Sequence, residues 1–521
     1  MKILLIYPLF PPTFWSYDTI LELAGRKVLL PPLGLITVAA ILPQTWEYRL
    51  VDRNIRSVTE EEWDWADMVI LSGMIVQKTD MIDHIREAKK RGKSVAVGGP
   101  YPTSLPDEVA EADFLILDEG EITIPLFVAA VERGETQGVF RTTEKPDVTS
   151  TPIPRYDLLE LSYYDSMSVQ FSRGCPFQCE FCDIIVLYGR KPRTKSPRQL
   201  LAELDYLYEL GWRQGLFMVD DNFIGNKRNV RLLLIELKKW QQEHQYPFRF
   251  NTEASIDLAD DQELMDLMVD CNFDAVFLGI ETPDEDSLTM TKKFQNTRSS
   301  LSVAVEKIIR SGLRPMAGFI IGFDGEKKDA AKRIINFVEL SAIPTAMFGM
   351  LQALPHTALY HRLEKEGRLR INSKQDINQS TLMNFVPTRP IEDIAREYVE
   401  TFSTLYDPEI FLDRTYRCFL ILGAPRCKPP FKLPQMRDLK ALAIIVWRQG
   451  FKRHTRWKFW HHLFSILRHN PAVWEHYLTV CAHNEHFMVY RDIVRREIEA
   501  QLVEFQKQEL ILNESKAMAS R

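Results

Sequence analysis

The feature that most constrains the fold of this chain is a repeated alternation of short apolar runs with helical stretches. Five such runs occur in the first 140 residues: KILLIY, YRLVD, MVILSG, SVAVGG and FLILDE. Apolar runs with little internal alternation are typical of strands buried on both faces of a parallel sheet. We therefore predict an N-terminal α/β domain, a doubly wound parallel sheet over residues 1–141, followed by a turn-rich linker over residues 142–164.

Open parallel sheets bind ligands at the carboxyl ends of their strands. In this domain those ends carry small or turn-forming residues, which let a ligand approach the backbone closely. These candidate ligand contacts are Pro8, Ser72, Gly73, Gly98, Gly99, Pro100, Glu119 and Gly120. The first strand is not followed by GxGxxG, so a dinucleotide is not expected. Taken alone, the glycines are also compatible with simple tight turns.

A second alternation covers residues 165–385, with six further runs: SVQFSRG, GLFMVDDN, FRFNTEAS, AVFLGIET, MAGFIIGF and AMFGMLQAL. Six strand and helix units of this size predict a partial, TIM-like (β/α)6 barrel, whose chemistry lies at the carboxyl ends of the strands. Acidic and polar residues gather at those ends. Residues 386–521 show only helical patterns and predict an all-α domain.

Three cysteines, Cys175, Cys179 and Cys182, directly follow the first barrel strand. A structural zinc site normally has four protein ligands, and no histidine lies nearby in the sequence. A cubane of four irons and four sulfides can instead be held by three thiolates, which leaves one iron open. The amino and carboxylate groups of S-adenosylmethionine (SAM) can chelate such an iron. The other four cysteines lie far apart and are expected to be small buried side chains in a reduced protein.

The barrel mouth also offers groups for the rest of SAM. Asp220, Asp221 and Asn222 suit its ammonium group, Glu281 suits the ribose hydroxyls, and Phe181 can flank the adenine. Further candidates at the same strand ends are Glu253, Ser255 and Gly279. No residue is singled out for hydrogen or proton transfer to the substrate.

The stretch CPFQCEFC matches the CX3CX2C signature of radical SAM enzymes, with an aromatic residue before the last cysteine. The stretches PPLGL, VGGPYPT and DEGE resemble the cobalamin-binding domain that precedes the barrel in one subgroup of these enzymes. Many relatives have histidine after GGP, where this chain has Tyr101, which we include among the expected cobalamin contacts. The stretches ALPHTALYHRLEKEGRL and WRQGFKRHTRWKFW resemble the C-terminal region shared by hopanoid C-2 methylases and bacteriochlorophyll C-8 and C-12 methylases.

This resemblance implies three cofactors: a [4Fe–4S] cluster, SAM and cobalamin. It further implies a C-methyltransferase in which one SAM yields a 5'-deoxyadenosyl radical that takes hydrogen from the substrate, and a second SAM methylates cobalamin. The acceptor would be an unactivated carbon of a hopanoid-like lipid, and a flavodoxin or ferredoxin would supply electrons. Two alternatives stay open: a radical oxidative cyclase or rearranging enzyme acting on a tetrapyrrole or other apolar metabolite, and a noncatalytic sensor.

The formal net charge of −6 conceals a basic segment. Residues 421–470 contain eleven Lys or Arg and a single acid, Asp438, interleaved with tryptophans. The pattern fits peripheral contact with an anionic membrane face, or equally a helical core with a solvated basic surface. Nucleic acid is not expected, because the chain as a whole is acidic. The first apolar run is too short for a signal peptide, so we expect a cytoplasmic protein that binds at most peripherally to the inner membrane face.

Overall fold

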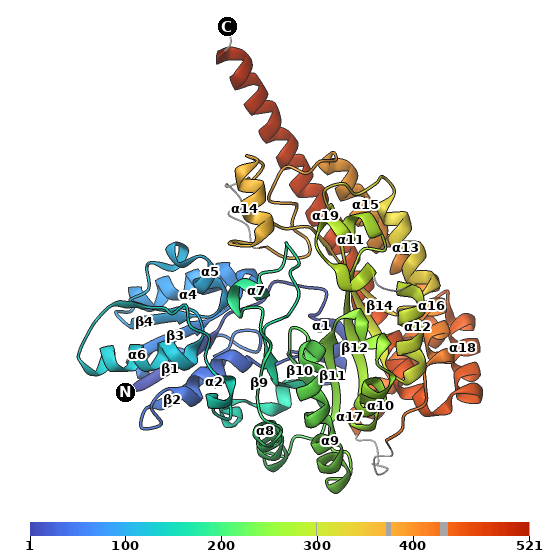
Figure 1. The fold of residues 1–521 in the computed structure, drawn as a ribbon, viewed down its shortest axis with the longest axis horizontal. Coiled ribbons are helices and arrows are strands. Elements are labelled where there is room, and N and C mark those ends of the chain that lie inside the picture. The colour runs from blue at the N-terminus through green and yellow to red at the C-terminus, as the bar shows by residue number, and fades with distance from the viewer. Residues whose placement is uncertain (298–299, 371–376, 428–435, 520–521) are drawn as a thin grey trace.

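The computed structural model describes residues 1–297, 300–370, 377–427 and 436–519. Its N-terminal part is a six-stranded parallel sheet with strand order β2-β1-β3-β4-β5-β6 (Figure 1). The strands are β1 Lys2–Tyr7, β2 Glu47–Asp52, β3 Met68–Ser72, β4 Ser94–Gly98, β5 Phe114–Ile116 and β6 Gly138–Phe140. Helices cover both faces, so this is the doubly wound sheet that the apolar runs predict.

The burial of β1 explains why its sequence is almost wholly apolar. Leu4 and Ile6 point into a core on one face, beneath α3 (Glu60–Trp65) and α4 (Lys78–Lys90). Ile3 and Leu5 point into a separate core on the other face, beneath α2 (Leu33–Ile41) and α6 (Gly120–Glu132). Side chains of a strand alternate between faces, so a strand covered on both sides needs apolar residues at every position.

The central part is a second parallel sheet, with strand order β14-β13-β12-β11-β10-β7. Its strands are β7 Ser166–Val169, β10 Gly215–Met218, β11 Arg249–Ala254, β12 Phe273–Glu281, β13 Arg314–Ile321 and β14 Thr345–Met350. Because β7 and β14 are the two ends of the order, the barrel is open. The longer helices of this part are α8 Pro197–Glu209, α9 Lys227–Glu243, α10 Gln262–Asp270, α12 Leu301–Ser311 and α13 Ala330–Leu340.

The C-terminal part is helical and packs against the barrel at its last strand, β14 (Figure 1). It comprises α15 Ile391–Leu405, α16 Pro408–Ile421, α17 Met436–Trp447, α18 Arg456–His469 and α19 Trp474–Ala519. One hydrophobic core runs through the barrel and these helices without interruption. The loop after β1 joins that core, because the ring of Phe14 stacks on that of Phe487 in α19 at 4.5 Å between centroids. Helix α1 (Asp18–Leu23) follows and packs on α19 as well.

The structure confirms the predicted fold class, including the parallel sheet, the partial barrel and the all-α C-terminal region. Two short strands were not predicted, β6 at the sheet edge and β9 (Arg193–Thr194). Two or three residues are too few to give a periodic pattern. The predicted first barrel strand, SVQFSRG, is divided between β7 and β8 (Ser172–Arg173), and β8 pairs with β9. Cys271, Cys418, Cys427 and Cys481 are buried and unpaired, as expected. Within the described ranges, no helix combines the length and apolar character needed to cross a membrane.

Candidate functional site

The carboxyl ends of the two parallel sheets face a shared cavity of about 880 Å³. The N-terminal sheet contributes most of the strand-end residues that the sequence singled out, namely Ser72, Gly73, Gly98, Gly99, Pro100, Glu119 and Gly120. The barrel contributes Ser168, Gln170, Phe217, Val219 and Asp221. Apolar side chains of the loop and helix after β1, such as Phe10, Trp15 and Leu33, complete the wall. A cavity of this size suits a large organic ligand.

Two glycines give the N-terminal side of the cavity its shape. Gly99 has φ of +94°, and a Cβ there would lie 2.7 Å from Ser72 Oγ, so the turn after β4 accepts only glycine. Gly34, in the PPLGL stretch, lines the cavity, and a Cβ on it would meet no atom within 4 Å. The space beside Gly34 is therefore open, and a larger side chain would fill it. Such open space allows a bulky cofactor to pack closely against the backbone.

Pro8 and Tyr101, the other two expected cobalamin contacts, lie outside this lining. Pro8 uses its carbonyl to accept from Gln77 Nε2 at 2.5 Å. Tyr101 is buried in the core on the α4 face, and its hydroxyl donates to Glu108 at 2.8 Å. The side chain after GGP therefore faces the protein core in this chain.

The loop that carries the three cysteines begins directly after β8 and is held from below by Asp220. The two carboxylate oxygens of Asp220 accept from the backbone N–H groups of Phe171 (2.8 Å) and Ser172 (2.7 Å), and from the Ser172 hydroxyl (2.6 Å). Asp220 is fully buried, and burial raises its pKa to about 7. Three donors of the loop occupy its carboxylate, which gives Asp220 a positioning role, and its expected contact with the SAM ammonium stays a prediction.

A glycine lets the cysteine loop turn. Gly174 has φ of +91°, and a Cβ there would lie 2.8 Å from the carbonyl oxygen of Gly189. The N–H of Cys175 donates to that same carbonyl at 3.3 Å. The RGC sequence thus places the backbone of the first cysteine against the loop between α7 (Ile184–Leu187) and β9.

Cys175, Cys179 and Cys182 are free thiols, and burial raises the pKa of each. In the part of the chain that is described, no three His, Cys, Asp or Glu side chains converge as ligands of a single ion. A cubane makes a different demand, because each thiolate binds a separate iron atom. Three unpaired thiols on one loop, with no fourth ligand beside them among the described residues, fit that group.

Beside the thiols, the interior of the barrel contains carboxylates that make few hydrogen bonds. Asp221 lines the cavity, and its buried Oδ2 has no hydrogen-bond partner among the described residues. Burial raises its pKa to about 6. Glu253, on the adjacent strand β11, has its pKa raised to about 8 by burial and by the charges of Asp221 and Glu281. An orphaned carboxylate oxygen facing the cavity fits a cationic ligand group such as the ammonium of SAM.

The remaining candidates for SAM contact form a hydrogen-bonded set around the mouth. Asn222 accepts from the N–H of Ser255 at 3.2 Å and donates to its hydroxyl at 3.2 Å. Glu281 forms an ion pair with Lys293. A Cβ on Gly279 would lie 2.8 Å from both of those charged groups, so this glycine makes room for the pair. The ring of Phe181 packs 5.8 Å from that of Phe323.

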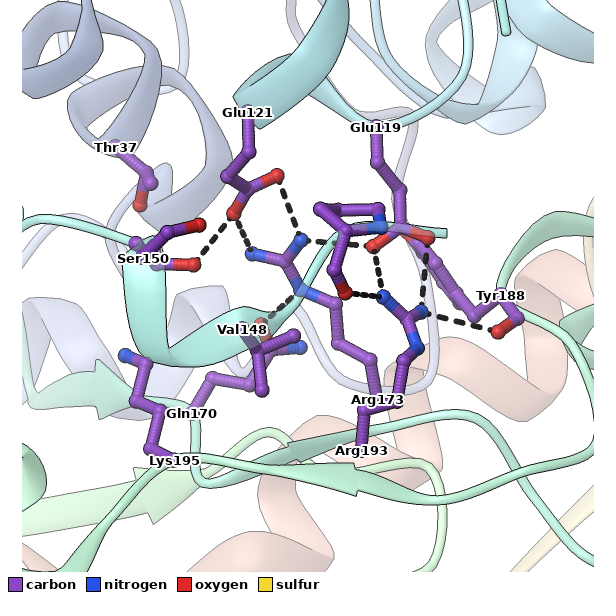
Figure 2. Close-up of polar contacts among 12 residues, drawn as sticks. Thr37, Glu119, Glu121, Val148, Ser150, Gln170, Arg173, Tyr188, Arg193 and Lys195 are labelled. Carbon is purple, nitrogen blue, oxygen red and sulfur yellow. Dashed lines mark hydrogen bonds and ion pairs between the residues drawn. The ribbon is translucent and has the colours of Figure 1, made fainter. Parts of the chain in front are cut away.

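A buried ion cluster ties the cysteine loop to the N-terminal sheet. Figure 2 shows the carboxylates of Glu119 and Glu121 pointing towards the guanidinium groups of Arg173 and Arg193 from the opposite side. Arg173 bonds Glu119 at 3.0 Å and Glu121 at 2.8 Å, while Arg193 bonds Glu119 at 2.8 Å. All four side chains are at least 87% buried. Two cations and two anions therefore neutralise each other where the two sheets meet.

Sequence reasoning missed Arg173, Arg193 and Glu121 as part of the site, although Arg173 and Glu121 fall inside the stretches RGCPFQCEFC and DEGE. It also missed Lys293, Gln295 and Asn296. These three lie in KKFQN, which matches no pattern of spacing or periodicity. Their proximity to the thiols comes from tertiary packing alone.

Comparison with known proteins agrees with this geometry. Residues 23–128 match the B12 binding domain, residues 169–338 match the Radical SAM superfamily, and residues 357–500 match a domain of unknown function. An uncharacterized methyltransferase of Synechocystis sp. is 76% identical, over 97% of this chain and 95% of its own length. Hopanoid C-2 methylase of Rhodopseudomonas palustris is 34% identical, over 94% of this chain and 93% of its own.

Among solved structures, the radical SAM methyltransferase TsrM of Kitasatospora setae, with cobalamin and a [4Fe–4S] cluster bound, shares the fold. The TM-score is 0.59 at 13% identity, covering 96% of this chain and 99% of that one. The matched families imply SAM, a [4Fe–4S] cluster and cobalamin as the cofactors. The chain belongs to the radical SAM superfamily, among the cobalamin-dependent methyltransferases that include hopanoid C-2 methylase.

Proposed function

We propose that this enzyme transfers a methyl group to an unactivated carbon of an apolar, hopanoid-like lipid. In this proposal Cys175, Cys179 and Cys182 hold the [4Fe–4S] cluster, and the cavity lining from Ser72 to Gly120 holds cobalamin. When bound, the cluster with SAM supplies a carbon-centred radical and cobalamin supplies the methyl group. The observation that carries the proposal is the shared cavity, because it lies between the N-terminal sheet and the barrel strand ends, where Arg173 and Tyr188 flank the cysteine loop in sequence.

The chain's own contribution is to bind, orient and exclude water. Asp221 and Glu253 offer carboxylates to the SAM ammonium, and binding of that cation removes the cost of burying their charge. Asn222 and Ser255 fix the strand ends beside them. Asp220 holds the cysteine loop by its backbone and so sets the position of the thiolates. Apolar side chains around the cavity keep water from the reacting carbon.

The wall of the cavity favours an apolar substrate. Trp15 reaches from the loop after β1 to the barrel, where its ring lies 5.8 Å from that of Phe277 and its Nε1 lies 3.1 Å from Met347 Sδ. Phe217 and Val219 add apolar surface from β10. A fused-ring hydrocarbon can pack against such a wall without leaving polar groups unpaired. The likeness to hopanoid C-2 methylase supports the same class of substrate.

The test is anoxic incubation of the reconstituted enzyme with cobalamin, reductant, methyl-deuterated SAM and a lipid extract containing hopanoids and tetrapyrroles, followed by mass spectrometry. We expect a labelled methyl group on a hopanoid, together with 5'-deoxyadenosine and S-adenosylhomocysteine. Deoxyadenosine without labelled product would instead support cyclisation or rearrangement. Replacing the chemical reductant with flavodoxin or ferredoxin tests the proposed type of electron donor.

We further propose that the enzyme docks on an anionic phospholipid surface through α17, α18 and the π-helical turn between them (η9, Arg448–Lys452). Four rings form a ladder there: centroids are 5.5 Å apart from Trp447 to Phe451, 5.9 Å from Phe451 to Trp460 and 5.7 Å from Trp460 to Phe464. Trp457 on α18 is 75% exposed. Large exposed rings of this kind are characteristic of interfacial helices.

Charge on the same helices supports an anionic partner. Lys440, Lys452, Arg456 and Arg468 are exposed, whereas Arg453 and Lys458 are engaged by Glu485 and Asp413. The inner face of α18, with Phe459 and Ile466, packs into the helical core. The two interpretations of the basic stretch are therefore compatible. Its inner face packs into the core, and its outer face carries charged and aromatic side chains. Lys428 and Lys432 lie outside the described residues.

Flotation with vesicles tests this docking. The wild type should float with vesicles rich in phosphatidylglycerol at low salt, and less at high salt or with phosphatidylcholine alone. Trp457→Ser with Phe464→Ser should abolish flotation, while Leu232→Ser with Val303→Ser, which are more than half exposed on α9 and α12, should not. Wild type that stays in solution would overturn the proposal. So would a dimer that the first pair of substitutions converts to monomer, because the surface would then be a subunit interface.

A further inference from the structure

A second segment, residues 291–296, contacts the cysteine loop at Cys179 and Glu180. It follows α11 (Glu285–Met290) and enters the 3-10 turn η8 (Phe294–Thr297). The carbonyl oxygen of Thr291 accepts from the N–H of Glu180, inside the cysteine loop, at 3.3 Å. The segment is therefore attached to the loop by its backbone.

Asn296 fixes the segment to the barrel. Its buried Nδ2 donates to the carbonyl oxygens of Gly279 (3.0 Å) and Ile280 (2.9 Å) at the end of β12. This attachment sets the positions of the two neighbouring polar side chains, Gln295 and Lys293. Both are more than 90% buried, which is unusual for an amide and an ammonium away from solvent.

Gln295 points its amide towards a cysteine. Its Nε2 lies 3.8 Å from Cys179 Sγ, within reach of an N–H···S hydrogen bond. A thiol is a weak acceptor, but a thiolate bound to iron carries negative charge and accepts such a bond much better. The contact therefore gains its full strength only when the loop holds the cluster.

Lys293 brings a positive charge to the same place. Its ammonium pairs with Glu281 and lies 5.9 Å from the ring of Phe181, the residue before Cys182. Burial raises the pKa of the Cys179 thiol, and the charge of Lys293 opposes that effect. A cation buried this deeply is stable only near negative charge. Glu281 supplies part of that charge, and thiolates of a bound cluster would supply the rest.

We infer that Gln295 and Lys293 raise the reduction potential of the [4Fe–4S] cluster, by an N–H···S bond to Cys179 and by a cation facing the same thiolates. Reduction adds one electron from the external donor, so the reduced cluster is the more negative state. Hydrogen-bond donors and cations stabilise that state more than the oxidised one. These are positioning residues for the cluster. The inference rests on the proposed cluster ligands but not on methyl transfer.

The test is a redox titration of reconstituted enzyme followed by electron paramagnetic resonance, with iron and sulfide measured first. Gln295→Leu should retain the cluster and shift its midpoint potential to a more negative value. Gln241→Leu is the matched control, because Gln241 is equally buried but donates to the carbonyl oxygens of Phe248 and Cys271, away from the loop. Its potential should equal that of the wild type. Lys293→Met should give a second negative shift, which Lys293→Arg should largely reverse.

An unchanged midpoint in Gln295→Leu and Lys293→Met at full cluster content would overturn the inference while leaving the cluster ligands intact. Wild type without a cluster would instead contradict the ligand assignment in the proposed function. If Gln295→Leu does not assemble a cluster, Gln295→Asn keeps an amide but is too short to reach Cys179, and the same negative shift is expected. Failure of that variant to assemble as well would make Gln295 a structural residue and overturn its tuning role.

Discussion

Arg173 and Glu119 meet across the boundary between the two parallel sheets, with Arg173 Nη1 3.0 Å from Glu119 Oε2. Glu119 lines the cavity at the end of β5, and Arg173 stands two residues before the first cysteine of the cluster loop. One buried contact thus joins the N-terminal sheet to the cysteine loop. The sheet and the loop are held in register by neutralised charges and not by apolar packing alone.

Replacing one of the four charged side chains in this buried ion cluster should therefore destabilise the fold. In Arg173→Met, Glu121 loses its salt-bridge partner and Glu119 keeps only Arg193. A buried charge left without its partner destabilises a protein by about 3 to 5 kcal/mol. We expect a loss of that size in the free energy of unfolding, measured by urea denaturation of the apoprotein.

Arg86→Met provides the comparison. Arg86 pairs with Glu111 at 2.9 Å, but both side chains are more than half exposed. Exposed pairs contribute at most about 1 kcal/mol. Equal losses in the free energy of unfolding for Arg86→Met and Arg173→Met would mean that the buried ion cluster does not help to hold the two domains together.

Glu253 should make the apoprotein less stable at high pH. Its pKa in the folded state is about 8, above the ordinary value, mainly because it is buried. The folded state therefore binds the proton more tightly than the unfolded state, and this stability is present at acidic pH and lost as pH rises towards 8. Glu253→Gln should raise the free energy of unfolding at pH 8 by about 4 kcal/mol, and by much less at pH 4.5.

The same substitution should weaken SAM binding at least tenfold, because the carboxylate that favours a cation is gone. Exposed Glu243→Gln, at the end of α9, should change neither quantity. Urea titrations at the two pH values and equilibrium dialysis of SAM measure both effects. Glu253→Gln that binds SAM normally would remove Glu253 from the site.

The sequence predicted the long strands of both sheets, and the reason is clearest at β1, β3 and β4, which are apolar because both of their faces are buried. It could not separate Asp220 from Asp221. Neighbouring residues on a strand end point in opposite directions, so one faces the backbone of Phe171 and Ser172 while the other faces the cavity. The sequence could not place Tyr101 either, because the ring of this residue, on the short helix α5 (Pro100–Ser104), lies in the core and outside the cavity lining. Gln295 and Cys179 are 116 positions apart, and only the folded barrel brings them together.

Gly34 should control access of cobalamin to its side of the cavity. Gly34→Leu places a branched side chain in the open space, so cobalamin affinity should fall at least tenfold while the fold is retained. Gly34→Ala adds one methyl group within α2 and should lower affinity only slightly. It should also stabilise the helix by about 0.5 to 1 kcal/mol. Absorbance titration with hydroxocobalamin and urea denaturation test both variants. Undiminished affinity in Gly34→Leu would place the corrin elsewhere.

Replacing each of the seven cysteines should separate those that bind the cluster, whose loss lowers the iron content, from those that only pack in the core, whose loss lowers stability. Cys179→Ala should lose nearly all bound iron and sulfide after anoxic reconstitution, because the cubane then has only two thiolates on the loop. Cys271 is fully buried between α10 and β12, and its Sγ donates to the carbonyl oxygen of Leu234. Cys271→Ala should keep the full iron content but lose about 1 to 2 kcal/mol of stability through the small cavity it leaves. Iron analysis together with urea denaturation separates the two effects. Iron retained in Cys179→Ala, or lost in Cys271→Ala while the protein stays folded, would contradict the assignment of the cluster to residues 175–182.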